Sequence, residues 1–258
     1  MILVLGGTAD SRMVVRELKE AGHPVMVTVV SSYGGALAAG EKPDEVLVQA
    51  LEPQELSELI TRHKIIAVVD ATHPFAQKIS VMAREVCSEQ GVSYLRYSRP
   101  GTTLPEHPLI TLISGYKEAA ESAARLGEVI FLTTGSNTLE VFTTAAGLLQ
   151  KKIVARVLPD PQVLVKCFEL GLQPSQIIAM QGPFSKELNK AMFQHASAGV
   201  VVTKESGGVG GVAATVEAAL ELAIPVVVIA RPVEEIESNY KTLNDILEFI
   251  EKATRREN

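Results

Sequence analysis

Two glycine-rich turns in this sequence have the residue types that bind anions. The segment 203–211, TKESGGVGG, follows the apolar residues 200–202 and precedes a helix-like stretch. A shorter turn, GGT at residues 6–8, follows the apolar residues 2–5. A turn between a strand and a helix directs backbone N–H groups and the positive helix end at one place, which suits a phosphate or a carboxylate. For residues 6–8, whose pattern is shorter than GxGxxG, an ordinary tight turn is the alternative.

Cationic side chains follow several predicted strands of a chain whose formal net charge is −6. They are Arg96, Arg99, Arg156, Lys204 and Arg231. A charged group at the end of a buried strand needs a partner. Because ligands of open α/β sheets bind beyond the carboxyl ends of the strands, that partner could be an anionic ligand. For Arg156 and Lys204, a salt bridge to Asp160 or Glu205 is the alternative.

The end of the second predicted strand bears on the choice of nucleotide. An NAD site usually carries Asp or Glu about 20 residues after the glycine turn, where the acid holds the ribose 2′-hydroxyl. Here residues 28–34 read TVVSSYG and contain no acid. Serine hydroxyls, together with Arg12 on the first predicted helix, would suit a 2′-phosphate instead. If a dinucleotide binds, NADP is favoured over NAD; the alternative is that residues 31–35 form only a flexible loop.

Residues that could transfer protons or cap helices stand at the same strand ends. His73 precedes Pro74, which favours extended geometry where the chain leaves a strand. The sequence leaves open whether His73 transfers a proton, lines the site or only makes structural hydrogen bonds. Helix capping is the expected role of Asp10, Asp70, Thr72, Ser136 and Asn137. No GxSxG elbow and no Ser/His/Asp order indicates a protein nucleophile.

The bulk properties argue against several classes of protein. With 47% hydrophobic and 21% charged residues, the 258-residue chain has the composition of one or two globular domains. Its net charge of −6 argues against non-specific nucleic-acid binding. No apolar run approaches the ~20 residues that span a bilayer, and Met1 leads directly into a strand. We therefore expect no nucleic-acid or membrane partner and a cytoplasmic location.

Neither the cysteines nor the histidines predict a metal site. Cys87 and Cys167 are far apart and have no CxxC partner, so we expect buried thiols in a reducing compartment. The five histidines stand singly, without a ligand spacing such as HxxxH. We expect no metal bound by the protein itself.

Short β-branched runs alternate with longer helical segments along the chain. Strands are expected at 2–5, 25–30, 45–48, 65–70, 94–96, 109–113, 129–132, 153–157, 177–180, 199–202 and 226–229. Helices are expected at 10–21, 53–63, 75–90, 117–126, 137–146, 161–170, 185–194 and 211–223. The strands are continuously apolar, which is typical of a parallel sheet covered by helices on both faces. The pattern predicts a doubly wound α/β fold.

A domain boundary is indicated at residues 99–105, RPGTTLP, where two prolines and a glycine follow a predicted strand. We expect an N-terminal Rossmann-like domain over residues 1–99, which would be the NADP-binding domain if a dinucleotide binds, and a second Rossmann-like domain over residues 100–232. Residues 233–258 are predicted to form a C-terminal helix that could pack on the first domain. The sequence leaves open where this helix docks and which oligomeric state the protein adopts.

Seven segments carry a further indication of function. They are ILVLGGTADSR, VVDATHPFA, RYSRP, FLTTGSNTL, ARVLPDP, QGPFS and TKESGGVGG. Together they resemble, in the same order, the precorrin-6A reductase family of corrin-ring biosynthesis, including its cobalt-precorrin-6A branch. The resemblance covers Ile2 to about Pro232, and DATHPFA combined with RYSRP and the SGGxGG turn is its most specific part.

The resemblance implies two Rossmann-like halves that face one another across a cleft holding NADPH and a tetrapyrrole substrate. The implied reaction is hydride transfer from NADPH to one carbon of the C18–C19 double bond of precorrin-6A, with a proton delivered to the other carbon. The product is precorrin-6B or its cobalt form. The nicotinamide supplies the reactivity, so this reaction needs no protein nucleophile.

The resemblance also implies roles for individual residues. Contacts to the cofactor pyrophosphate and ribose are expected from Gly6, Gly7, Thr8 and Arg12. The adenosine-side loop is matched by Ser32, Tyr33 and Gly34, and the nicotinamide-side loop by Thr72, His73 and Pro74. The facing wall, which would line the substrate, is matched by Ser136, Lys204, Ser206, Gly207 and Gly208. One departure is Ala9-Asp10, where many relatives carry Glu after the GGT turn.

The substrate of this family carries acetate and propionate groups, whose carboxylates need cationic partners. We predict that these partners are Arg96, Arg99, Arg156, Lys186 and Lys204. The catalytic proton could come from His73, from Lys204 or from bound water. The sequence does not distinguish a metal-free from a cobalt-bearing substrate.

Two other functions are compatible with a cationic cleft. A two-domain tetrapyrrole synthase or lyase that uses no nicotinamide would bind no dinucleotide. A non-catalytic, anion-binding cleft protein is the second alternative. The absence of a recognisable secretion signal and the turn at residues 6–8 count against the second alternative.

Overall fold

The structure, a computed structural model, describes residues 1–98, 101–207, 211–232 and 242–255 of the chain. It divides the chain into two compact units. Unit 1 combines Met1–Pro100 with Val233–Asn258, and unit 2 comprises Gly101–Pro232. The chain therefore leaves unit 1 once, completes unit 2, and returns to unit 1.

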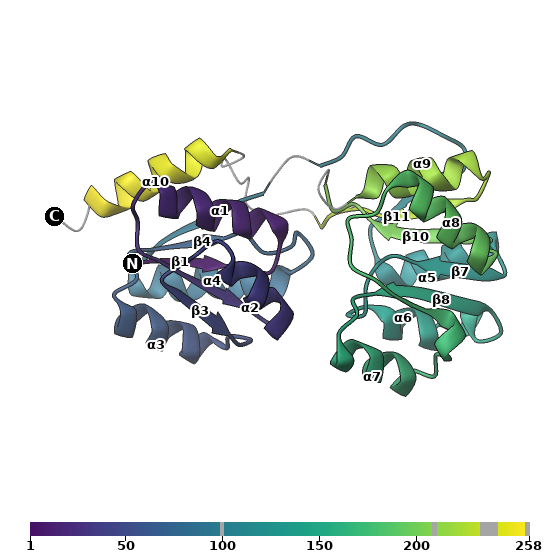
Figure 1. Cartoon of the computed structure of the whole chain (residues 1–258), viewed down its shortest axis with the longest axis horizontal. Coiled ribbons are helices and arrows are strands. Elements are labelled where there is room, and N and C mark those ends of the chain that lie inside the picture. Colours follow the sequence, from purple (N-terminus) through teal and green to yellow (C-terminus); the bar gives the residue numbers. More distant parts are fainter. Residues whose placement is uncertain (99–100, 208–210, 233–241, 256–258) are drawn as a thin grey trace. The chain divides into compact units, whose positions relative to one another are not determined.

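Among the described residues, unit 1 is built around a five-stranded parallel sheet (Figure 1). Its strands are β1 (Ile2–Leu5), β2 (Val25–Val29), β3 (Glu45–Val48), β4 (Ala67–Asp70) and β5 (Ser93–Arg96). Their order is β3-β2-β1-β4-β5, so the chain first moves outward from β1 in one direction and then resumes on the other side with β4. The carboxyl ends of β1 and β4 flank this switch point, where ligands of such sheets bind.

Helices cover both faces of this sheet, so every residue of β1, β2 and β4 is buried, including the polar residues Thr28 and Asp70. The helices are α1 (Ala9–Glu20), α2 (Ser32–Ala39), α3 (Pro53–His63), α4 (Gln77–Gln90) and α10 (Leu243–Arg255). On one face, α1 and α10 pack against strand residues such as Val4 and Val27. On the other face, α3 and α4 pack against the alternate residues, such as Leu3 and Met26, in a core that includes Cys87.

The C-terminal helix α10 is part of the core of unit 1. Its residues Ile246, Ile250 and Ala253 are at most 5% exposed and share a core with Val14 and Val69. These three residues recur at a helical spacing, so α10 presents one apolar stripe to the unit. The predicted helix over 233–258 lies partly outside the described residues, and its described part begins at Leu243.

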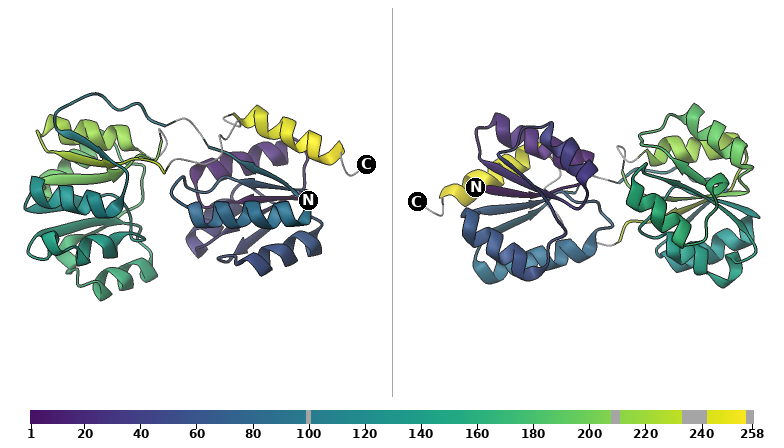
Figure 2. Two further views of the ribbon diagram at one scale, coloured as in Figure 1. Left: turned by 180° about the vertical axis from the view of Figure 1, so that it is seen from behind. Right: turned by 60° about the horizontal axis from the view of Figure 1, so that its bottom comes forward.

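In the part of unit 2 that the structure describes, six parallel strands form one sheet (Figure 2). They are β6 (Ile110–Ile113), β7 (Val129–Leu132), β8 (Lys152–Val157), β9 (Ile177–Ala179), β10 (Val200–Lys204) and β11 (Val226–Ile229). The order is β6-β11-β10-β7-β8-β9. The switch point of this sheet therefore lies between β7 and β10, and Lys204 ends one of the two flanking strands.

The helices of unit 2 are α5 (Tyr116–Leu126), α6 (Leu139–Thr144), α7 (Pro161–Glu169), α8 (Lys186–Ala196) and α9 (Val212–Glu221), with short 3₁₀ turns at Ala146–Leu148 and Pro174–Gln176. The helices α8 and α9 share a core with β-strand residues such as Phe131 and Val201. Phe193 of α8 packs edge-on against Phe131, with ring centroids 4.9 Å apart. The predicted doubly wound α/β class is thus confirmed, with one parallel sheet in each unit.

One helix lies where the sequence left a flexible loop as an alternative, and that alternative is wrong. Residues 32–39 form α2, and Ser31 caps it by accepting a hydrogen bond from the Gly34 N–H at 3.1 Å. Gly35 packs so closely against β3 that a Cβ there would lie 2.6 Å from Val48 Cγ2. Tertiary packing therefore fixes a helix whose two glycines disfavour one locally.

Within the described residues, no helix combines the length and the apolar character needed to cross a membrane.

Candidate functional site

The turn after β1 holds α1 and the loop after β4 together. The Thr8 hydroxyl accepts a hydrogen bond from the Ser11 N–H at 2.9 Å, and the Thr8 N–H donates to Ser11 Oγ at 3.1 Å. The Thr8 hydroxyl also donates a hydrogen bond to the Ala71 carbonyl at 2.8 Å. Thr8 is therefore the N-cap of α1, and the expected capping role of Asp10 is wrong because Asp10 lies within the first turn.

The two glycines of this turn meet different surroundings. A Cβ at Gly6 would lie 2.9 Å from Val27 Cγ2, so the lack of a side chain lets β1 end close to β2. Gly7 has a φ of +104°, which disfavours any residue with a Cβ, and a Cβ there would meet nothing within 4 Å. The space beside Gly7 is thus open to a ligand, as a phosphate cradle requires.

The predicted adenosine-side residues lie at the end of the neighbouring strand β2. Ser32, Tyr33 and Gly34 form the first turn of α2, whose backbone N–H groups point back toward the carboxyl end of the sheet. Arg12 lies over the β1 turn, and its Nη1 donates to the Thr8 carbonyl at 3.3 Å. The fold therefore brings Arg12, the β1 turn and the α2 N-terminus to adjacent strand ends.

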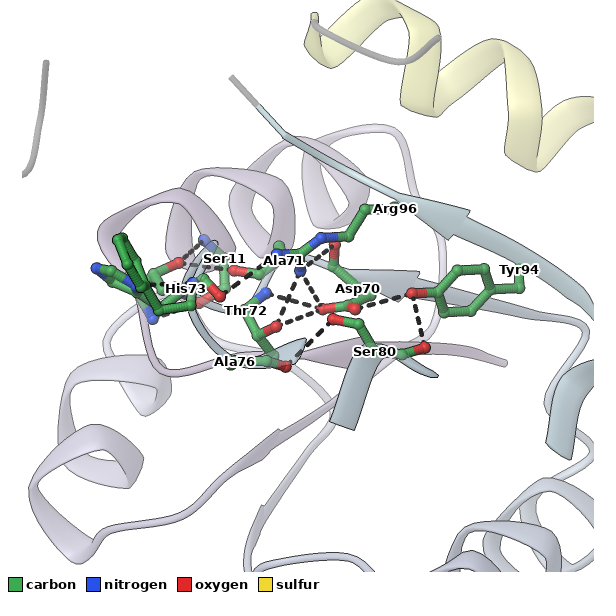
Figure 3. A network of polar contacts seen from close by, with 11 residues as sticks. Ser11, Asp70, Ala71, Thr72, His73, Ala76, Ser80, Tyr94 and Arg96 are labelled. Atoms are coloured by element: carbon green, nitrogen blue, oxygen red, sulfur yellow. Dashed lines mark hydrogen bonds and ion pairs between the residues drawn. The ribbon is translucent and has the colours of Figure 1, made fainter. Parts of the chain in front are cut away.

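A buried carboxylate organises the loop after β4 (Figure 3). Asp70 is 0% exposed, and its Oδ1 accepts hydrogen bonds from the Thr72 N–H at 3.0 Å and the Thr72 hydroxyl at 2.7 Å. The Tyr94 hydroxyl donates to Asp70 Oδ2 at 2.8 Å. The expected capping of the next helix by Asp70 or Thr72 is wrong, because α4 begins only at Gln77 with Ala76 as its N-cap.

Arg96 completes this network from the neighbouring strand β5. Its Nη1 forms an ion pair with Asp70 Oδ1 at 2.6 Å and donates to Thr72 Oγ1 at 2.9 Å. Its Nη2 donates to the His73 carbonyl at 3.3 Å. The Arg96 side chain is 9% exposed, so these bonds hold the backbone of residues 70–73 in place. Its predicted contact with a substrate carboxylate stays a prediction.

Tyr94 is held in its neutral form by the same surroundings. Burial raises the pKa of Tyr94, and the Asp70 carboxylate beside it raises the pKa further. The hydroxyl therefore keeps its proton and remains a donor to Asp70 at physiological pH. Tyr94 and Arg96 are two residues apart on β5, which is the spacing that places two side chains on one face of a strand.

His73 presents one ring nitrogen to its own loop. Its Nδ1 accepts a hydrogen bond from the Phe75 N–H at 3.3 Å, and the two rings lie 5.6 Å apart between centroids. In a neutral imidazole, a nitrogen that accepts leaves the proton on the other one, Nε2. Since Nδ1 is engaged within the loop, Nε2 is the ring nitrogen that could meet a ligand. Pro74 follows in the same loop.

The turn after β10 contains a second buried carboxylate, Glu205. It accepts hydrogen bonds from the backbone N–H groups of Thr102 and Gly207, both at 2.9 Å, and forms an ion pair with Arg231. Glu205 therefore pairs with Arg231, and the alternative that it pairs with Arg156 or Lys204 is wrong. Lys204 and Ser206, on either side of Glu205, are partly buried, and burial lowers the pKa of Lys204.

Arg156 is a partly buried cation that lies among uncharged groups. Its Nη1 donates to Asn189 Oδ1 at 2.6 Å, and its guanidinium lies 3.9 Å from the centre of the Phe184 ring. Asp160 caps α7 instead, so the alternative salt bridge from Asp160 to Arg156 is not formed. In the described part of the chain no carboxylate pairs with Arg156. Burial lowers its pKa to about 10, which an anionic ligand would offset.

The remaining predicted residues of unit 2 differ in their surroundings. Lys186 forms an ion pair with Glu221 at 2.5 Å on the surface of α8 and α9. Ser136 lies in the loop after β7, and Thr138, which makes no side-chain capping bond, is the N-cap of α6. The expected capping by Ser136 and Asn137 is therefore wrong. Arg99 and Gly208 lie outside the described residues.

Sequence reasoning missed the partners of Asp70 and of Arg156. Tyr94 could have been found from its spacing to Arg96, because alternate strand residues share a face. Asn189 and Phe184 carry no such signal, since they approach Arg156 from a different element. Among the described residues, no group of three or more His, Cys, Asp or Glu side chains is arranged to hold a metal ion.

The chain is similar to known proteins over nearly its whole length. The family model described as precorrin-6x reductase CbiJ/CobK matches residues 1–251. Cobalt-precorrin-6A reductase of Priestia megaterium is 40% identical over 256 residues, which cover 99% of this chain and 100% of that protein. Precorrin-6A reductase of Mycobacterium tuberculosis is 34% identical over 235 residues, which cover 90% and 88%. The solved structure of CobK precorrin-6A reductase, 24% identical, matches the fold with a TM-score of 0.80 and covers 98% of this chain and 96% of that one.

Proposed function

The chain belongs to the precorrin-6x reductase family, and we propose that it uses NADPH to reduce the C18–C19 double bond of precorrin-6A or its cobalt form. Membership identifies an oxidoreductase of cobalamin biosynthesis, which argues against the synthase, lyase and non-catalytic alternatives. The observation that carries the proposal is the match along residues 1–251, together with 40% identity to a relative covered from end to end. The product would be precorrin-6B or its cobalt form.

The residues of unit 1 fit a nicotinamide dinucleotide. A ligand phosphate would occupy the open space beside Gly7 and accept hydrogen bonds from the backbone of the β1 turn. Ser32, Tyr33 and Gly34 would hold the adenosine side, and Thr72, His73 and Pro74 the nicotinamide side. When bound, NADPH supplies the hydride. The chain supplies orientation, because Asp70 and Arg96 fix the backbone of the nicotinamide-side loop.

The residues of unit 2 fit an anionic substrate. Arg156 has no carboxylate partner in the described part of the chain, and its fork of donors suits a carboxylate of the macrocycle. Lys204, Ser206 and Gly207 lie at the switch point of the sheet, where a ligand is expected. The proton that completes the reduction would come from His73, from Lys204 or from bound water.

Gly7→Ala is expected to weaken NADPH binding by about tenfold or more, because a methyl group would enter the proposed phosphate cradle. Its matched control is Gly22→Ala, since Gly22 also has a positive φ, +81°, and open space within 4 Å. Both variants should lose about 1–2 kcal/mol of stability from backbone strain. Calorimetric titration with NADPH separates them, and equal affinities in both variants would place the phosphate elsewhere.

NADPH is expected to bind about tenfold to a hundredfold more tightly than NADH, because a charge-assisted hydrogen bond from Arg12 to a 2′-phosphate contributes about 1.5–3 kcal/mol. No acid at residues 28–34 competes with that phosphate. Calorimetry with both nucleotides checks the ratio, and Arg12→Met should abolish the difference. Equal affinities in the unchanged protein would contradict the proposed specificity.

The test of the proposed function is an anaerobic assay of the purified protein with cobalt-precorrin-6A and, separately, precorrin-6A. NADPH absorbance is followed together with the mass of the tetrapyrrole. The cobalt form is tried first, because the 40% identical relative is named for it. A gain of two hydrogens that requires NADPH supports the proposal and identifies the branch. NADPH binding without oxidation by either substrate would reject the proposed acceptor.

A further inference from the structure

The carboxylate of Glu205 joins three segments of unit 2 that are distant in sequence. It follows directly after β10, and its side chain is 11% exposed. Oε1 accepts the backbone N–H groups of Thr102 and Gly207, each at 2.9 Å, and Oε2 forms the ion pair with Arg231 Nε. Hydrogen bonds to an ionised acceptor are stronger than those between neutral groups. The three segments are therefore held by one charged group.

Two of these partners mark the places where the chain enters and leaves unit 2, which we call the two chain crossings of unit 2. The unit begins at Gly101 and ends at Pro232, so Thr102 and Arg231 each lie one residue inside its limits. The backbone of Gly101 also lies against the carboxylate, since a Cβ there would be 3.3 Å from Oε2. The Glu205 N–H donates to the Ile229 carbonyl at 2.8 Å, which ties the same residue to the end of β11.

We propose that Glu205 is a positioning residue whose carboxylate fastens both chain crossings of unit 2 to the turn that carries Lys204, Ser206 and Gly207. A displacement of either crossing is then transmitted to that turn through one side chain. The kinetic consequence rests on the proposed function, because the turn carries residues proposed to bind the tetrapyrrole. The fastening itself is independent of catalysis and is tested separately.

Hydrogen exchange tests the fastening directly. In the unchanged protein the amides of Thr102 and Gly207 are expected to be protected, and the amide of the exposed neighbour Thr103 is not. Glu205→Gln removes the negative charge, so exchange at Thr102 and Gly207 should accelerate by about tenfold or more. The matched control is Glu128→Gln, which breaks a surface ion pair with Lys151 in the same unit and should leave both amides unchanged.

Kinetics distinguishes positioning from a merely structural role. In Glu205→Gln, kcat for the tetrapyrrole should fall about tenfold to a hundredfold while the Kd for NADPH changes less than about twofold. Arg231→Lys, which keeps a cation beside Glu205, should retain more activity than Arg231→Met.

The proposal is overturned if a folded Glu205→Gln variant keeps the kcat and the Thr102 exchange rate of the unchanged protein. Equal exchange of Thr102 and Thr103 in the unchanged protein would overturn it as well, even if no variant folds. If the unchanged protein reduces no tetrapyrrole, the proposed function fails, whereas hydrogen exchange still decides whether Glu205 fastens the two crossings.

Discussion

Asp70→Ala is expected to lower the free energy of unfolding by about 3–5 kcal/mol, the cost of leaving a buried charge without its partner. Asp70 is fully buried, and Arg96, whose side chain is 9% exposed, would keep its charge in a poorly solvated place. The hydroxyls of Thr72 and Tyr94 would each lose an acceptor as well. Equilibrium urea unfolding without ligand, monitored by circular dichroism, measures the loss.

The matched control for this prediction is Glu41→Ala. Glu41, whose side chain is 14% exposed, forms an ion pair with Arg16, whose side chain is 56% exposed. The Arg16 charge left behind would stay in contact with water, so the change should cost no more than about 1 kcal/mol. Both changes break one carboxylate–guanidinium pair of unit 1, and they differ in burial. Similar losses in the two variants would show that the Asp70–Arg96 pair contributes no more than a surface pair.

Lys204→Met is expected to lower kcat/KM for the tetrapyrrole about a hundredfold, because either role proposed for the ammonium group is of that size. The residue ends β10 at the switch point of the unit 2 sheet, and the methionine side chain keeps similar bulk. The proposed NADPH-binding residues lie in unit 1, so the affinity for NADPH should change little. Because the methionine side chain fills similar space, the free energy of unfolding should change little as well. Steady-state kinetics under anaerobic conditions measures the effect.

The role of Lys204 follows from whether the loss in kcat/KM arises from KM or from kcat. A rise in KM with kcat unchanged indicates a carboxylate contact, and a fall in kcat indicates proton delivery. Burial lowers the pKa of Lys204, so deprotonation as the pH rises would set in earlier than for an exposed lysine. If Lys204 delivers the proton, the fall of kcat/KM at high pH disappears in the variant.

The control for Lys204→Met is Lys190→Met, which removes a surface lysine paired with Glu221 in the same unit. Its kcat/KM should remain close to that of the unchanged protein. A Lys204→Met variant with equally unchanged kinetics would remove Lys204 from the proposed site.

The architecture was predictable from the sequence because strands that are buried on both faces of a sheet leave a recognisable mark, a short and largely apolar run. Strands such as residues 2–5 and 226–229 are apolar throughout, and both were predicted on that pattern. The helix at residues 32–39 carried no such mark. It contains Gly34 and Gly35, and it depends on packing against Val48, a residue of another element.

The position of the cationic residues near strand ends was predictable from the sequence, whereas the groups that they contact were not. The sequence showed that Arg96 and Arg156 stand near strand ends, but the choice between Asp70, Asn189 and a ligand depends on which elements become neighbours. Arg96 meets Asp70 because β4 and β5 are adjacent and in register at those two residues. Arg156 meets Asn189 because α8 packs over β8. Such pairings follow from tertiary arrangement and leave no local pattern.

The packing of α10 on unit 1 has a consequence for how the chain folds while the ribosome makes it. Ile246 and Ile250 belong to the same core as residues near the N-terminus, yet the ribosome makes them only after all of unit 2. Unit 2 is continuous in sequence, so it can fold as soon as it has emerged. The nascent unit 1, although made first, would expose the apolar surface that α10 later covers, and chaperones would have the most to protect there.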